Sequence, residues 1–161
     1  YPGGPQIDKL AKEGNPEAID FPQALKEKGN FEFSFSGLKS AVLNYLNSMQ
    51  QKGIIVNKAD VAASFQRAVI DILIEKALQA VKNAKLDTLV LAGGVAANSA
   101  LEARLKDAAA KEGIQFYYPD RILCTDNAAM IGCRGYYQSR IQDFASLHLN
   151  AVPGLQLENR E

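Results

Sequence analysis

The spacing of apolar residues along the chain alternates between helical and strand-like periods. Residues 5–14 have a helical pattern, and Gly14 is suited to cap the C-terminal end of that helix. The preceding "YPGGP" predicts a type II turn in which Gly3 or Gly4 takes a positive φ. Apolar and polar residues then alternate with period two in "FEFSFSG", which predicts a half-buried strand over residues 31–36.

A helical period returns after this strand. Apolar residues recur at helical spacing over residues 38–49, and Gly53 ends the pattern. A longer helix is predicted over residues 60–83, with Asp60 as its N-cap. Residues 1–86 are therefore expected to be mainly helical, with one strand.

The second half of the chain predicts a βαβα unit over residues 87–144. Its first strand, "DTLVLAG", is continuously apolar, as expected for a strand that is covered on both faces. A helix follows in which Ser99 and Glu102 form a capping box and which Gly113 ends. The next strand is "IQFYYP", and the last helix is "TDNAAMIGCRGYYQSRIQDF". This order argues for a parallel sheet with a crossover helix, followed by a tail without a clear element over residues 145–161.

The composition is that of a globular protein of 161 residues, with 47% hydrophobic and 22% charged residues. Eighteen basic and eighteen acidic residues give no net charge, which argues against a chain-wide surface for nucleic acid or membrane and leaves a local basic patch open. Cys124 and Cys133 fit neither a disulfide framework nor a CxxC metal site, so we expect packed thiols in a reducing compartment. No run has the length of a transmembrane helix and no signal peptide is visible, so we expect a cytoplasmic protein that does not bind membranes.

The stretch "LVLAGGVAANSAL" places two glycines and an asparagine where the first strand of this unit passes into a helix. In parallel sheets, ligands collect beyond the C-terminal ends of the strands. Gly93 and Gly94 leave room for a nucleotide to approach the backbone, and Asn98 can donate and accept hydrogen bonds at once. A Gly-Gly turn with an Asn cap is also an ordinary way to begin a helix, and neither the P-loop nor the dinucleotide-binding fingerprint is present. These residues alone leave both interpretations open.

The segment "CTDNAA" follows the second strand of this unit and also has two interpretations. Thr125, Asp126 and Asn127 are all good N-cap residues for the last helix. Asp126 is also a hard oxygen ligand for a cation at the strand ends, where the helix dipole favours its ionised form. No catalytic residue is identified, because the serines of "FSFSG" lack a nearby histidine and His148 is the one histidine of the chain.

Five motifs occur in a specific order, namely "YPGGP", "FSFSGLK", "ASFQ", "LVLAGGVAAN" and "CTDNAAMI". In this order and spacing they resemble the C-terminal half of the tRNA threonylcarbamoyladenosine synthase family, which is called TsaD in bacteria. The resemblance extends from residue 1 to about residue 137. It implies an α/β chain that forms the C-terminal lobe of an actin-like ATPase fold, the fold of sugar kinases and Hsp70, with a largely helical first half.

The resemblance also implies a reaction and part of a site. Members of the family transfer a threonylcarbamoyl group from threonylcarbamoyl-adenylate to N6 of the adenosine beside the tRNA anticodon. The motifs carry over Gly4 and Asn98 as contacts of this adenylate or of another adenine nucleotide, and Gly93 and Gly94 as residues that line the same pocket. Asp126 corresponds to a ligand of one divalent metal, which the resemblance indicates to be iron.

Other features of the family are absent from this sequence. An HxxxH motif completes the metal site in the family, and His148 cannot supply it. We therefore expect a C-terminal fragment that lacks the N-terminal lobe, holds an incomplete metal site, is inactive alone and self-associates through exposed apolar surface. The resemblance implies tRNA and TsaB-like and TsaE-like proteins as partners, and Lys39 of "SGLK" either faces substrate or RNA phosphates or is solvated.

Two alternatives belong to other functional classes. The chain could be a non-catalytic, nucleotide-binding partner subunit of the same complex, although such a subunit has no need for the metal-side Asp126. A metalloprotease needs at least three protein ligands for zinc and a general base, and the sequence lacks the HExxH motif that supplies them.

Overall fold

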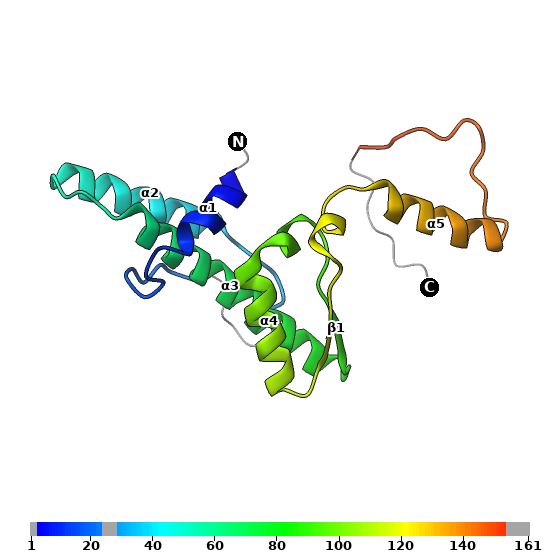
Figure 1. The fold of residues 1–161 in the computed structure, drawn as a ribbon, viewed down its shortest axis with the longest axis horizontal. Helices are drawn as coiled ribbons and strands as arrows, with labels where there is room; N and C mark the ends of the chain where they lie inside the picture. Colours follow the sequence, from blue (N-terminus) through cyan, green and yellow to red (C-terminus); the bar gives the residue numbers. More distant parts are fainter. Residues whose placement is uncertain (1–2, 24–28, 154–161) are drawn as a thin grey trace. The chain divides into compact units, whose positions relative to one another are not determined.

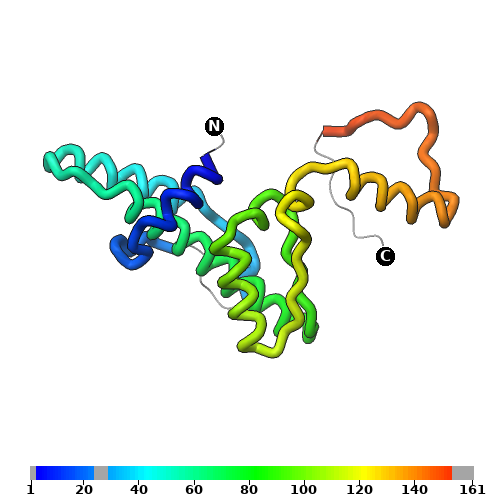
Figure 2. Tube along the Cα trace, viewed as in Figure 1, coloured from blue at the N-terminus to red at the C-terminus, as the bar shows by residue number. Residues whose placement is uncertain are grey.

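The computed structural model describes residues 3–23 and 29–153. The chain divides into two compact units, Tyr1–Thr125 and Asp126–Glu161, which we describe separately. Figures 1 and 2 trace the elements of both units. In chain order these are α1 (Gly3–Ala11), α2 (Ser36–Gln51), α3 (Lys58–Asn83), β1 (Thr88–Val90), the 3-10 helix η1 (Gly94–Ala97), α4 (Ser99–Lys111), β2 (Gln115–Tyr117), the 3-10 helix η2 (Arg121–Leu123) and α5 (Ala128–Arg140).

Helix α3 is the element around which the first unit is built, because α1, α2, α4 and β1 all contact it. Small residues let α1 approach closely, and Ala11 packs against Ala62 and Ala63 of α3. Gly14 lies so near the start of α3 that an added Cβ would be 2.0 Å from the carbonyl oxygen of Ala59. Since α1 already ends at Ala11, Gly14 serves this close approach and not the helix cap that the sequence predicted.

The main apolar cluster of the first unit joins α2 and α3 to the segment that precedes α2. Phe21, Leu38, Val61 and Ala68 are its buried members. The ring of Phe21 meets that of Tyr45 edge to face, with centroids 5.9 Å apart. Burying such side chains contributes about 1.5–3 kcal/mol each for the larger apolar residues, so this cluster fixes α2 along α3.

A second cluster sets β1, α4 and β2 against the C-terminal half of α3. The two strands are parallel, with Leu89 opposite Phe116, and α4 forms the crossover between them, as the sequence predicted. Leu89 and Phe116 pack on the buried residues Val81 and Ala109. The opposite face of the strands stays exposed among the described residues, because α3 and α4 cover the same side. The expectation that both faces are covered is therefore wrong for this part of the chain.

The expected turn at the N-terminus is instead the start of α1, which begins at Gly3. Neither Gly3 nor Gly4 has a positive φ. The helix can begin this early because Pro5 lies in its first turn, where a missing N–H group leaves no intrahelical hydrogen bond unmade.

The predicted strand over residues 31–36 is also wrong, because α2 begins at its end and the residues before it have no regular structure. The period-two pattern nevertheless places the rings of Phe33 and Phe35 on one side, stacked at 6.1 Å. The buried Lys76 holds this segment against α3, since its Nζ donates a hydrogen bond of 2.6 Å to the carbonyl oxygen of Asn30. Alternation alone does not make a strand, because a strand also needs a neighbouring backbone, and none pairs here among the described residues.

Two helix caps differ from the expected ones. Asn57, not Asp60, caps α3 by accepting a hydrogen bond from the backbone N–H of Ala59. Asp60 instead accepts one from the backbone N–H of Asn15, at 2.8 Å. The cap of α4 is Asn98 and not Ser99. The observed cap lies three residues before the predicted one in α3 and one residue before it in α4, and in both cases the side chain of the predicted residue binds a different part of the fold.

The second unit consists of α5 and the segment that follows it. Asn127 caps α5 by accepting a hydrogen bond of 2.9 Å from the backbone N–H of Met130. No residue of α5 is buried. The tail beyond it has no helix or strand up to residue 153, as predicted, and the rest of the predicted tail, residues 154–161, lies outside the described residues. None of the helices in the described ranges has both the length and the apolar character needed to cross a membrane.

Candidate functional site

The first unit contains a cavity of about 830 Å³ that is lined by α1, α2, α3, η1 and the start of α4. Most of its walls are Val, Leu, Ile and Phe side chains. The polar side chains of the lining are Ser36, Lys39, Gln66 and Asn98. Apolar walls with a few polar groups, in a volume of roughly 300–1,000 Å³, are typical of sites for small molecules and cofactors.

Asn98 joins the cavity to the framework of the first unit. Its Oδ1 accepts a hydrogen bond of 2.9 Å from the backbone N–H of Leu101, which makes Asn98 the cap of α4. Its Nδ2 donates one of 3.1 Å to Oε1 of Gln66 on α3. A side-chain amide has two N–H donors and two acceptor lone pairs, so these two bonds leave one donor and one acceptor position of Asn98 for a ligand. Capping and ligand contact are therefore compatible at this residue.

Gly93 and Gly94 shape the turn that leads to Asn98. Gly93 has φ of 91° and ψ of 174°, a conformation that residues with a Cβ rarely adopt. Gly94 begins η1, and a Cβ added there would meet no atom within 4 Å. Val95 and Asn98 line the cavity, whereas Gly93 and Gly94 are not among its lining residues. The turn thus places Asn98 at the cavity, and direct ligand contact by the two glycines stays a prediction.

Gly4 lines the same cavity from the first turn of α1. The structure therefore brings together Gly4 and Asn98, which lie far apart in the sequence. A hydrogen bond fixes this arrangement, because the hydroxyl of Ser99 donates to the carboxylate of Asp8, with both oxygens at 3.3 Å. Asp8 is also paired with Lys12 at 3.8 Å.

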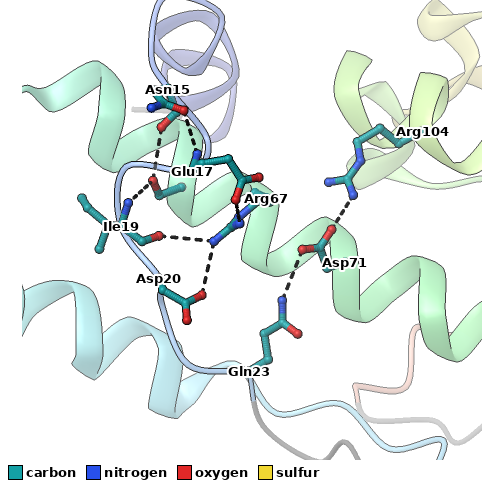
Figure 3. A network of polar contacts seen from close by, with 9 residues as sticks. Asn15, Glu17, Ile19, Asp20, Gln23, Arg67, Asp71 and Arg104 are labelled. Carbon is teal, nitrogen blue, oxygen red and sulfur yellow. Dashed lines mark hydrogen bonds and ion pairs between the residues drawn. The ribbon is translucent and has the colours of Figure 1, made fainter.

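A second cavity of about 440 Å³ shares Gln66 with the first and has a different character. Its basic lining residues, Lys12, Arg67 and Arg104, are each held by a carboxylate. Figure 3 shows that Asp71 pairs with the guanidinium of Arg104. The positive charges of this second cavity are thus neutralised within the protein.

The segment between α1 and α2 is bound along α3 by the polar network of Figure 3. Arg67 of α3 pairs with Glu17 and Asp20 and donates a hydrogen bond of 3.4 Å to the carbonyl oxygen of Ile19. The fully buried hydroxyl of Ser64 accepts a hydrogen bond of 3.1 Å from the backbone N–H of Ile19. This network holds the segment in place without drawing on the polar groups of the larger cavity.

Glu102 of α4 organises the loop that follows β2. Its carboxylate pairs with Arg121 at 3.3 Å. A hydrogen bond to Glu102 and the negative charge of Glu102 raise the pKa of the Tyr118 hydroxyl above its ordinary value. The predicted capping box at Ser99 and Glu102 is therefore wrong, because both side chains bind other parts of the fold.

Asp126 is the first residue of the second unit, and its side chain is exposed. Because Asn127 is the cap of α5, capping does not explain an acidic residue at position 126. The described residues contain no group of three His, Cys, Asp or Glu side chains that could hold a metal ion. Asp126 therefore does not make a metal site with the part of the chain that the structure describes.

The cysteines differ in their surroundings. Cys124 is buried and its thiol lies 3.8 Å from the carbonyl oxygen of Pro119, as expected for a packed thiol. Cys133 is exposed on α5, so the expectation of a packed thiol is wrong there.

Two polar residues of the larger cavity were not assigned a role from the sequence. Gln66 is the last residue of the "ASFQ" motif, and Ser36 is one of the serines that lack the nearby histidine a nucleophile needs. The motif was a usable signal for Gln66, but its role depends on the hydrogen bond with Asn98, which joins α3 to α4. A pairing of this kind is set by tertiary packing and cannot be read from the spacing of residues.

Comparisons with known proteins agree with this arrangement of motifs. Residues 1–133 match the sequence profile of the family described as "TsaD: tRNA N6-adenosine threonylcarbamoyltransferase". Proteins named tRNA N6-adenosine threonylcarbamoyltransferase are similar over almost the whole chain. One from Desulfitobacterium hafniense is 59% identical over 157 residues, which are 98% of this chain and 46% of that protein. One from Moorella thermoacetica is 56% identical over 157 residues, again 98% of this chain and 46% of that protein. One from Clostridium perfringens is 53% identical over 160 residues, or 99% of this chain and 47% of that protein. The chain thus spans about half the length of the curated relatives that it matches.

Proposed function

Because the chain belongs to the TsaD family of tRNA N6-adenosine threonylcarbamoyltransferases, we propose that it forms the C-terminal part of such an enzyme. In this proposal its elements belong to one lobe of an actin-like fold, and a preceding N-terminal lobe completes the nucleotide site. The chain alone is then inactive. tRNA and TsaB-like and TsaE-like proteins are the proposed partners of the complete enzyme.

One observation carries the proposal, namely that Gly4 and Asn98 line a single apolar cavity. Nothing in the packing of the described residues explains a glycine at position 4, since a Cβ added there would meet no atom within 4 Å. Glycine in a helix costs about 0.5–1 kcal/mol relative to alanine. A ligand that approaches the backbone of α1 accounts for this residue, and the same ligand can use the remaining donor and acceptor of Asn98.

The proposed reaction is the transfer of threonylcarbamoyl from threonylcarbamoyl-adenylate to N6 of an adenosine in tRNA. The bond between the carbamoyl carbon and the phosphate oxygen breaks, a bond from that carbon to N6 forms, N6 loses a proton, and AMP leaves. The apolar walls of the cavity bind the adenine ring of the adenylate, and Asn98 hydrogen-bonds its nucleoside part. The task of this chain is thus to bind and orient the donor. A donor held in the right geometry no longer carries the entropic cost of being brought into place for the reaction.

The metal of the family does not fit the described residues by themselves, since Asp126 is a single exposed carboxylate. We propose Asp126 as one ligand of a divalent metal, iron by the family resemblance, whose other ligands lie outside the described residues. One carboxylate leaves most of a coordination sphere unfilled, so the described residues cannot hold the metal by themselves.

Substitution of Asn98 tests the proposed site. Asn98→Ser keeps a side-chain oxygen for the cap of α4 and removes the amide donor. In the complete gene product that carries this chain, we expect it to weaken AMP binding and to lower threonylcarbamoyl transfer to tRNA about tenfold, the cost of one or two lost hydrogen bonds. The exposed Asn47 of α2 provides the matched control, and Asn47→Ala should change neither quantity.

Three other results would each lead to a different conclusion. Unchanged AMP affinity in Asn98→Ser would contradict the proposed site. A lower thermal stability that accounts for the loss of binding would point to the cap alone. Nucleotide binding by the complete gene product without transfer to tRNA would favour a non-catalytic partner subunit.

A further inference from the structure

We propose that Lys39 binds the phosphate group of the nucleotide in the larger cavity and thereby makes the site selective for an adenylate over the neutral nucleoside. This inference rests on the proposed function, because it assumes that the cavity binds an adenine nucleotide. It adds a residue to the site and gives that residue a specific chemical partner.

Lys39 is the one charged side chain among the described residues that line this cavity. The other polar groups of the lining are two amides and a hydroxyl, and the remaining walls are apolar or glycine. A nucleotide monophosphate that enters such a cavity brings an adenine ring that suits the apolar walls and a phosphate that needs a cation. Within this lining, only Lys39 can neutralise that phosphate.

The ammonium group of Lys39 is also available for such a role. Among the described residues no carboxylate lies within ion-pairing distance of it, whereas Lys12, Arg67 and Arg104 of the second cavity are each paired with one. The two neighbouring cavities thus differ in their electrostatics. The cations of the second cavity are neutralised by the protein itself, whereas the cation of the larger cavity, Lys39, has no carboxylate partner among residues 3–23 and 29–153.

The start of α2 favours the same type of ligand. Lys39 lies in the first turn of this 16-residue helix, whose N-cap, Phe35, provides no side-chain hydrogen bond. The first turn also contains no acidic residue. Phe35 and Ser36 themselves line the cavity, so the positive end of the helix dipole and the Lys39 side chain act at the same place.

The adenylate phosphate suits this position better than a phosphate of the tRNA backbone. Contacts to a nucleic-acid backbone come from side chains on an accessible surface that follows the strand. Lys39 is itself exposed, but its side chain also lines a cavity together with the Gln66 and Asn98 amides and with apolar side chains, which is the environment of a whole small molecule.

Calorimetric titration of the complete gene product with AMP and with adenosine tests the inference. Lys39→Gln should weaken AMP binding about tenfold, because a hydrogen bond to a charged group is lost. The same substitution should leave adenosine binding unchanged, because adenosine has no phosphate. Lys39→Arg should retain the preference for AMP. Lys106→Gln, at an exposed lysine of α4 outside the cavity lining, should alter neither affinity.

The alternative outcomes separate this inference from the proposed function. If Lys39→Gln leaves the AMP-to-adenosine ratio unchanged while Asn98→Ser weakens both ligands, the role of Lys39 is refuted and the site stands. The role is equally refuted if Lys39→Gln weakens both ligands to the same extent, or if it weakens only tRNA binding. If Asn98→Ser weakens neither ligand, or the wild-type protein binds neither, the proposed site and the inference fail together.

Discussion

Asn98 illustrates why a single residue of this chain supports two interpretations. Its side-chain oxygen caps α4 and its amide nitrogen binds Gln66, so the fold needs Asn98 even without a ligand. Removing an Asn cap typically costs about 1 kcal/mol, and this structural role alone would explain the residue. The cavity indicates a second role in ligand binding, because Asn98 lines it together with Gly4. The residue type could be read from the sequence, but its second role required the position of α1.

The hydroxyl of Tyr118 should titrate later than an ordinary tyrosine. Its pKa is raised chiefly by its hydrogen bond to Glu102 and by the negative charge of that carboxylate. Because the folded-state pKa lies above the unfolded-state value, the interaction stabilises the fold fully below the unfolded pKa, and this contribution is lost as the pH rises through the folded pKa. An absorbance titration of tyrosinate should show one late-ionising group that disappears in Tyr118→Phe.

Substitution of Glu102 tests the same interaction from its other side chain. Glu102→Gln removes the negative charge and should bring the titration of Tyr118 back toward the ordinary tyrosine range. If the late-ionising group persists in Glu102→Gln, the carboxylate is not the cause of the raised pKa.

The helices could be predicted because the residues that set the apolar face and the ends of a helix lie close together in the sequence. The apolar period over residues 60–83 predicts α3, and Gly113 marks the C-terminal end of α4, whereas the N-cap of α4 was predicted one residue too late. The segment over residues 31–36 shows the limit of this approach. It has the alternation of a strand, but strand formation depends on a backbone partner from elsewhere in the fold, which periodicity does not reveal. Parallel pairing of β1 and β2 could be predicted because the helix between them leaves few other connections.

The junction between α1 and α3 should tolerate no side chain at Gly14. An alanine Cβ there would lie 2.0 Å from the carbonyl oxygen of Ala59, and the atoms it meets are backbone and cannot rotate away. We expect Gly14→Ala to lower the free energy of unfolding by about 1–3 kcal/mol or more, the usual cost of overpacking. Urea unfolding followed by circular dichroism measures this change.

Gly37 of α2 provides the matched control for this substitution. A Cβ added there would meet no atom within 4 Å. Gly37→Ala should therefore keep or raise stability, by up to about 1 kcal/mol, because alanine favours the helix. Equal stability of the two variants would show that α1 does not approach α3 as closely as described.

The sequence predicts the candidate site of the whole chain only in part. Motif order identified the family from sequence. Gly4 and Asn98, which the motifs indicate as contacts of one ligand, line the same cavity, and their contact with a ligand stays a prediction. Motif order did not anticipate the hydrogen bond between Gln66 and Asn98. A site assembled from distant segments is predictable in its motifs, whereas the contacts that tie those segments together depend on packing.

The exposed apolar side chains of α5 should make the 161-residue chain self-associate in solution. Met130 is 47% exposed and Tyr137 is 62% exposed, and the two side chains lie on one face of the helix, about 20° apart. Burying such a patch between two copies removes it from water, so sedimentation velocity should show association that increases with concentration.

Tyr137→Lys should weaken this association. Ser139→Lys adds the same charge about 200° further around the helix and should weaken it less. A monomer at all concentrations of the 161-residue chain, or equal effects of the two substitutions, would show that this face of α5 does not drive association.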